Sequence, residues 1–150
     1  MLLTGTFARS LDEKQRVAIP KRLRDALGAG TAVLYITPGN DGSLSIYTEE
    51  QLSRLAERLA ASSPAQQEVR AFGRLFYAQA ERAELDSQGR IRIPPDLARA
   101  AGLERDVVLL GVQNHIELWD KTRWETYLTS QLPRYDEIAE AAFGAQQKTT

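Results

Sequence analysis

Two closely related stretches of this sequence place basic side chains, which could contact a charged partner, at recurring positions. Residues 12–20 read DEKQRVAIP, and residues 86–94, which lie 74 positions later, read DSQGRIRIP. In each stretch an aspartate is followed four positions on by an arginine, and a proline closes the stretch. Arginines that recur at a fixed place suit contacts with a polyanion, whose phosphates they pair with directly. The doubled motif is therefore the candidate functional site.

For the other residues whose types could support catalysis or metal binding, a structural role is the better interpretation. Asp12 and Asp86 could be paired catalytic carboxylates, but we interpret each as pinning its own turn, because an aspartate bonds the backbone two residues on. His115 is the single histidine and there is no cysteine, so no metal site is predicted. Trp119 and Trp124 are interpreted as core or subunit-interface anchors rather than as a platform for bases. The sequence therefore predicts no enzyme, no cofactor and no small-molecule substrate.

Each copy of the motif predicts the same three elements in order. The aspartate and the residues after it form a turn. Apolar residues then alternate with polar ones, which predicts a strand with one buried face. The opposite face carries Arg16 in the first copy and both Arg90 and Arg92 in the second. A proline then starts a short helix, and each helix ends at a glycine, Gly28 or Gly102.

The rest of the chain repeats this order around further strands and helices. Strands are expected over 4–11, 31–36, 44–47, 78–85, 107–110 and 116–119. Helices are expected after the caps Thr48 and Asp120, after Ser63-Pro64, and on both sides of Pro133. The offset between the two caps is 72 rather than 74, so the intervening loop should be two residues shorter in the second half. An internal repeat of this kind predicts two halves that pack on each other.

Charge and composition restrict the partners that the chain can have. The 150 residues carry a formal net charge of −1, which argues against broad electrostatic capture of nucleic acid. Residues 1–28 nevertheless hold six Lys and Arg against three Asp and Glu, so the basic groups are local. The absence of cysteine and of a long apolar stretch predicts a soluble, cytoplasmic protein without a membrane partner.

The doubled motif Asp-x-x-Gly-Arg, followed by alternating apolar residues and Pro, resembles the MraZ family of bacterial transcriptional regulators. The run Glu117-Leu118-Trp119-Asp120 and the later Trp124 also resemble the second unit of that family. The resemblance implies a mainly β fold with added helices (α+β), a double-split, swapped-hairpin β-barrel built from two tandem AbrB-like repeats. The expected domains are 1–77 and 78–143, each one repeat with its helices, followed by a mobile tail over 144–150.

The resemblance also implies a function. It points to a transcriptional regulator that binds double-stranded DNA at promoter direct repeats as a homo-oligomeric ring, is associated with the nucleoid, and represses its own promoter and the adjacent cell division and cell wall genes. By motif position the implied DNA-binding residues are Lys14 and Arg16 in the first unit, and Gln88 and Arg90 in the second. Arg92 joins them from the same strand, although Ala18 is its counterpart.

One departure from the family pattern and two other function classes stay open. Gln15 stands where the motif has glycine, so either its backbone is strained or the first turn differs. Other swapped-hairpin proteins are antitoxins that repress their own operon. An antitoxin usually needs a long disordered tail that binds the toxin, and the polar tail of this sequence is short. A ring-forming scaffold without a DNA role is the third class, and the acidic overall charge is its best argument.

Overall fold

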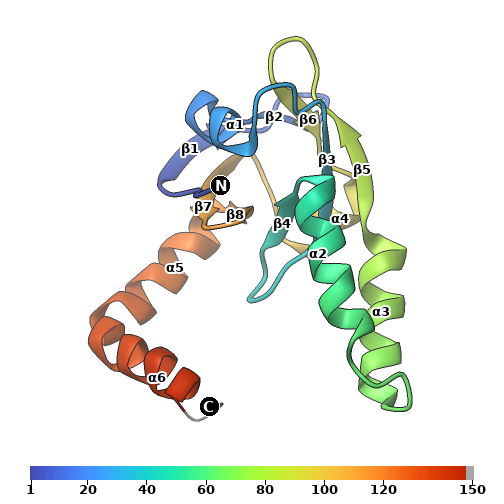
Figure 1. The fold of residues 1–150 in the computed structure, drawn as a ribbon. Helices are drawn as coiled ribbons and strands as arrows, with labels where there is room; N and C mark the ends of the chain where they lie inside the picture. Colours follow the sequence, from blue (N-terminus) through green and yellow to red (C-terminus); the bar gives the residue numbers. More distant parts are fainter. Residues whose placement is uncertain (148–150) are drawn as a thin grey trace.

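The computed structural model describes residues 1–147 and contains the predicted repeat (Figure 1). The first unit consists of β1 (Thr6–Ser10), β2 (Arg16–Ala18), α1 (Lys21–Leu27), β3 (Val33–Pro38), β4 (Leu44–Tyr47) and α2 (Glu49–Ala60). The second unit has the same order, with β5 (Glu81–Glu84), β6 (Arg90–Arg92), α4 (Pro95–Ala100), β7 (Asp106–Val112), β8 (His115–Asp120) and α5 (Lys121–Gln131). Helix α3 (Gln67–Gln79) joins the units, and the short 3-10 helix η1 (Leu132–Arg134) leads into α6 (Tyr135–Gln147).

The mixed α+β fold with two tandem repeats is confirmed, and several element boundaries differ from the sequence prediction. Ser63 and Pro64 lie in a turn before α3, and α3 runs to Gln79, so β5 starts three residues later than expected. Helix α6 continues through Gln147, so residues 144–147 of the predicted tail are helical. The remainder of that tail, 148–150, lies outside the described residues.

The two units exchange strands. Six antiparallel strands form one sheet in the order β1-β7-β8-β4-β3-β5, so the first strand of each unit pairs with a strand of the other unit. The two motif strands, β2 and β6, pair separately as an antiparallel ribbon. No long strand of either unit has all of its partners within that unit. This is the swapped-hairpin arrangement that the resemblance to the MraZ family implies.

A pseudo-two-fold axis relates the units. Val17 pairs with Ile91 at the centre of the ribbon, and these residues are equivalent at the offset of 74. Ser45 pairs with Glu117 at the centre of the sheet, and these are equivalent at an offset of 72. Arg9 and Ala83 are equivalent at the offset of 74, and they pair with Val107 and Leu34. These two partners lie 73 positions apart, so β3 and β7 are equivalent at an offset of 73. The two-residue change is therefore split, one residue before β3 and one in the β3–β4 turn, rather than placed in one loop.

The core lies between the ribbon and the inner face of the sheet. Val17 and Ile19 of the first motif and Ile91 and Ile93 of the second are at most 2% exposed. They belong to one apolar cluster with the inward side chains of the sheet, which are Leu34, Ile36, Leu44, Ile46, Val107, Leu109, Ile116 and Leu118. The alternation in the motifs thus buries one face of the ribbon and leaves the arginine face outside.

The helices that follow each unit form two arms. Figure 1 shows α2 and α3 running beside each other, and α5 and α6 leaving the strands as a separate arm. Thr48 and Asp120 cap α2 and α5, because their side chains accept hydrogen bonds from the backbone N–H groups of Gln51 and Arg123, as predicted. Within residues 1–147, no helix is both long enough and apolar enough to cross a membrane.

Residues 1–77 expressed alone should not form a stable monomer. In such a fragment β1 lacks β7, β2 lacks β6, β4 lacks β8 and β3 lacks β5, so every strand loses a partner and the edges stay open. We expect an unfolded chain, or a homodimer in which two copies exchange strands as the two units do here. Circular dichroism and light scattering on the fragment test this, and a folded monomer would contradict it.

Candidate functional site

The first motif builds a turn around the carboxylate of Asp12. Its Oδ1 accepts hydrogen bonds from the backbone N–H groups of Lys14 and Arg16, both at 2.9 Å. Its Oδ2 accepts one from Nε of Arg16 at 2.7 Å. The carbonyl of Asp12 accepts from the N–H of Gln15, which closes the turn. The aspartate therefore pins its own turn, as the sequence indicated.

The second motif repeats this geometry. Oδ1 of Asp86 accepts from the backbone N–H groups of Gln88 and Arg90 at 2.9 Å, and Oδ2 accepts from Nε of Arg90 at 2.8 Å. The backbone N–H of the motif arginine, which hydrogen-bonds the carboxylate, is the main cause that lowers the pKa of Asp12 and of Asp86 below the ordinary value. The stability gained is present above the ordinary aspartate pKa of about 3.9 and is lost as the pH falls through the lower folded pKa.

The ribbon presents the motif arginines together on its outer face. Arg16 lies directly opposite Arg92, and Ala18 lies opposite Arg90. Lys14 and Gln88 are exposed in the two turns, which flank the ribbon at its opposite ends. The structure therefore brings all five predicted site residues onto one continuous surface. Like charges directly across a ribbon destabilise it, so folding alone does not favour this arrangement.

Arg16 and Arg90 are more tightly held than the sequence indicated. Their side chains are 30% and 26% exposed, and each forms an ion pair with the aspartate of its own motif. Nη1 of Arg90 also lies 3.8 Å from Oδ2 of Asp12, which links the two motifs. Because Nε faces the aspartate, the Nη groups form no hydrogen bond within residues 1–147. Each arginine is pre-oriented, with the outer edge of its guanidinium left for a partner.

The backbone of Gln15 shows whether this residue is strained or the first turn differs from the second. Its φ is 60°, and the equivalent Gly89 has a φ of 75°, so both turns have the same left-handed conformation and Gln15 is the strained residue. A Cβ on Gly89 would lie 2.8 Å from Nε and Cζ of Arg24. The residue equivalent to Arg24 in the other unit is Ala98, so the first turn has room for a side chain where the second has none.

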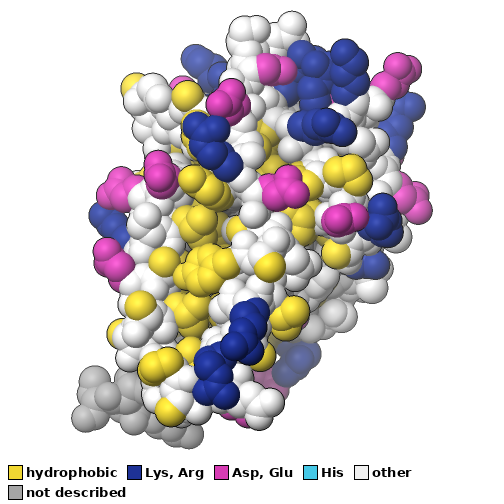
Figure 2. All heavy atoms as spheres, turned by 90° about the vertical axis from the view of Figure 1, so that its right-hand side faces the viewer, with side chains coloured by type: hydrophobic (Ala, Val, Ile, Leu, Met, Phe, Trp, Pro, Cys, Tyr) yellow, Lys and Arg dark blue, Asp and Glu magenta, His cyan; other side chains and the backbone are white. Residues whose placement is uncertain are grey.

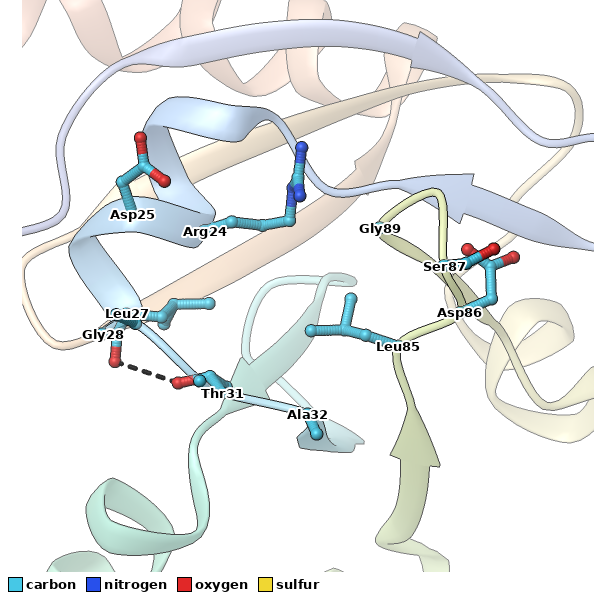
Figure 3. Close-up of a pocket in the computed structure, with 12 residues that line it drawn as sticks. Arg24, Asp25, Leu27, Gly28, Thr31, Ala32, Leu85, Asp86, Ser87 and Gly89 are labelled. Carbon is cyan, nitrogen blue, oxygen red and sulfur yellow. Dashed lines mark hydrogen bonds between the residues drawn. The ribbon is translucent and has the colours of Figure 1, made fainter.

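A shallow pocket of about 300 Å³ lies beside the second turn, between that turn and the loop after α1 (Figure 3). Figure 3 shows the side chain of Arg24 leaving α1 toward Gly89, with Leu27 and Leu85 lower in the pocket. Arg24 lies beside the second motif, and the sequence analysis did not include it among the site residues. Its signal was present in the repeat comparison, where a basic residue on one helix aligns with alanine on the other.

The remaining residues considered from sequence lie away from the ribbon. His115 stacks on Tyr47 with ring centroids 5.1 Å apart, and its Nδ1 lies 2.8 Å from the side-chain oxygen of Asn114. Trp119 and Trp124 contact each other on the outer face of the sheet, where α5 packs. Among residues 1–147 no group of three or more His, Cys, Asp or Glu side chains is placed to hold a metal ion.

Comparison with known proteins accounts for the doubled motif. A family model described as "MraZ protein, putative antitoxin-like" matches this chain twice, over residues 2–75 and 76–145. This chain belongs to the MraZ family. The two matches divide the chain close to the boundary between the two structural units, in α3.

Full-length relatives support the same assignment. The transcriptional regulator MraZ of Heliobacterium modesticaldum is 38% identical over 139 residues, which cover 93% of this chain and 95% of the relative. Its counterpart in Rhodococcus jostii is 38% identical over 143 residues, covering 95% and 98%. That of Acetivibrio thermocellus is 40% identical over 136 residues, covering 91% and 93%. The names of these relatives are those of regulators and not of enzymes, in agreement with the sequence analysis.

Replacing the strained residue should stabilise the protein. Gln15→Gly relieves a left-handed conformation that costs an ordinary residue about 1 kcal/mol, so the free energy of unfolding should rise by about that amount. Gly89→Ala introduces the same strain and a contact with Arg24, so it should lower stability by about 1–3 kcal/mol. Urea unfolding of both variants measures the opposite signs. Equal effects of the two substitutions would contradict the difference between the turns.

Proposed function

We propose that this protein is a transcriptional regulator that binds double-stranded DNA through the β2–β6 ribbon and its two turns. The observation that carries this proposal is the surface formed by Lys14, Arg16, Gln88, Arg90 and Arg92. A two-stranded ribbon has dimensions that fit the major groove. The regulator names of the relatives support the same function.

The motif geometry suits DNA contact rather than general surface charge. Asp12 and Asp86 hold the Nε edges of Arg16 and Arg90, so less side-chain entropy is lost when their Nη edges meet a partner. Arg92 is exposed and forms no ion pair within residues 1–147. Donors in such a row can read base edges, while Lys14 in the turn is placed for a phosphate. The proposed targets are the protein's own promoter on the nucleoid and the adjacent cell division and cell wall genes, which it would repress.

Arg16→Ala and Arg90→Ala should each weaken binding to the DNA upstream of the protein's own gene by about tenfold or more. Each loses a pair that is partly exposed, so the free energy of unfolding should fall by no more than about 1 kcal/mol. Arg54→Ala is the matched control, because Arg54 forms the same kind of i,i+4 ion pair with Glu50 but lies on α2. Fluorescence anisotropy with a scrambled duplex as reference measures this.

The outcomes separate a regulator from a scaffold. Normal DNA binding by the Arg16→Ala and Arg90→Ala variants would show that the ribbon is not the DNA-binding surface. Equal weakening by Arg54→Ala would show the same. No binding by the wild-type protein to the upstream duplex would favour the scaffold without a DNA role.

We further propose that the protein assembles into a homo-oligomeric ring through its helical arms. Exposed apolar residues gather on the arms, with Leu75 at 64% and Phe143 at 70% exposure. On α3, Phe72 and Leu75 border a groove of about 230 Å³ against the sheet. Figure 2, which faces this side, shows an apolar band between charged side chains. Apolar area of this extent on two different surfaces of one chain favours a head-to-tail contact that closes into a ring.

Charge on the two arms supports this pairing. Helix α3 carries Arg70 and Arg74 against a single acidic residue, Glu68. Helix α6 carries Asp136, Glu137 and Glu140, of which Glu137 pairs with Arg134. A second copy could therefore lay its acidic α6 arm against the basic, apolar face of α3. A ring would present the same ribbon many times at fixed spacing.

The operator should accordingly contain several short direct repeats on one face of the DNA. Binding to the second repeat becomes intramolecular, so a duplex with three or four repeats should bind about 10² to 10⁴ times more tightly than a duplex with one. Half-turn insertions between repeats and added salt should both weaken binding. The control is the double variant Phe72→Ser with Leu75→Ser, which should be smaller by light scattering and should lose the dependence on repeat number. Equal affinity of wild type for one repeat and four would exclude this mechanism.

An antitoxin-like function is the second candidate, because the description of the family model mentions it. An antitoxin of this fold would bind its own promoter through the same ribbon, so DNA binding does not separate the two. Co-purification of a small basic protein encoded beside this one would favour the antitoxin, and its absence from a complex that still binds DNA would favour the regulator.

A further inference from the structure

Arg24 crosses from the first unit to the turn of the second. Its Nε donates a hydrogen bond to the carbonyl of Ile19 at 3.0 Å, at the end of the ribbon. Its guanidinium covers Gly89, where a Cβ would lie 2.8 Å from Cζ and 3.0 Å from Nη1. The N–H of Ile19 in turn donates to the carbonyl of Gly89 at 2.9 Å. Arg24 is therefore fixed against the second turn by contacts from both units.

The two turns differ in where their positive charge comes from. The first turn carries Lys14, and the helix residue that faces it is Ala98 by equivalence with Arg24. The second turn carries the neutral Gln88 at the position of Lys14, and the helix residue beside it is Arg24. The first turn thus supplies a cation of its own, Lys14, whereas at the second turn the opposite unit supplies Arg24.

The outer edge of the Arg24 guanidinium has no partner among the described residues, 1–147. Neither Nη1 nor Nη2 forms a hydrogen bond or an ion pair within residues 1–147. The side chain is half-buried, and Figure 3 shows it extending from α1 toward the turn that carries Gly89. An arginine that is held by its Nε and keeps both Nη groups free is arranged to bind an oxyanion at small cost in side-chain entropy.

We propose that Arg24 is a DNA-backbone contact of the second turn and supplies there the charge that Lys14 supplies at the first. The inference rests on the proposed function, since it assigns a further residue to the same DNA-binding surface. A phosphate is the ligand rather than a base edge, because Arg24 lies at the end of the ribbon and not on the outer face that would enter the groove. The DNA-binding surface then contains a residue outside both motifs.

The test is the salt dependence of binding by Arg24→Gln to the duplex upstream of the gene. Removing one phosphate contact should weaken binding about tenfold or more and reduce the slope of log K against log salt by about 0.9 for each subunit engaged. Adding Gln88→Lys to Arg24→Gln should restore both the affinity and the slope, because it places lysine where the first turn has Lys14. Arg99→Gln, an exposed cation on α4 paired with Asp96, is the matched control and should change neither.

Three results would overturn the inference. The first is an unchanged affinity for Arg24→Gln. The second is weaker binding with an unchanged salt slope, which would make Arg24 a support for the turn only. The third is failure of Gln88→Lys to restore binding. Loss of binding in Arg16→Ala together with normal binding in Arg24→Gln would reject this inference alone, whereas no binding by the wild type would reject the proposed function.

Discussion

The antiparallel pairing between the two units is the interaction on which the rest of the structure depends. Val17 and Ile91 meet at the centre of the ribbon, and Ser45 and Glu117 meet at the centre of the sheet. Both the core and the outer arginine face exist because these pairs hold the units in register. A shift of one residue in β2 against β6 would turn Arg16 inward and expose Val17. The burial of four apolar motif residues opposes such a shift.

The aspartate in each motif converts this register into a defined surface. One carboxylate satisfies two backbone N–H groups of the turn and holds the arginine that leaves it. The same contacts shape the turn, orient the guanidinium and keep the carboxylate charged. The motif spacing of four residues from Asp to Arg follows from this geometry, because the arginine begins the strand as the turn closes.

The two units have diverged while keeping the same backbone. Gln15 and Gly89 have the same left-handed backbone, which strains Gln15 but not the glycine. Arg24 fills the space beside the second turn, and its equivalent Ala98 leaves that space open beside the first. The differences are coupled, since glycine at position 89 is what allows Arg24 to lie across the second turn. Two similar turns therefore present different chemistry at the two ends of one ribbon.

Sequence alone determined the repeat, the elements within each unit and the face of the ribbon that carries arginine. These follow from local rules: turn residues, alternation with a period of two, and helix caps at Thr48 and Asp120. Only the tertiary structure decided which strands pair, because exchange between units depends on contacts far apart in the chain. It also decided that Arg16 and Arg90 are held by aspartates, and that Arg24 belongs beside Gly89. Considered with its sequence neighbours alone, Arg24 is predicted to be a solvated surface charge. Nothing near it in the sequence shows that its guanidinium covers Gly89, which lies 65 residues later.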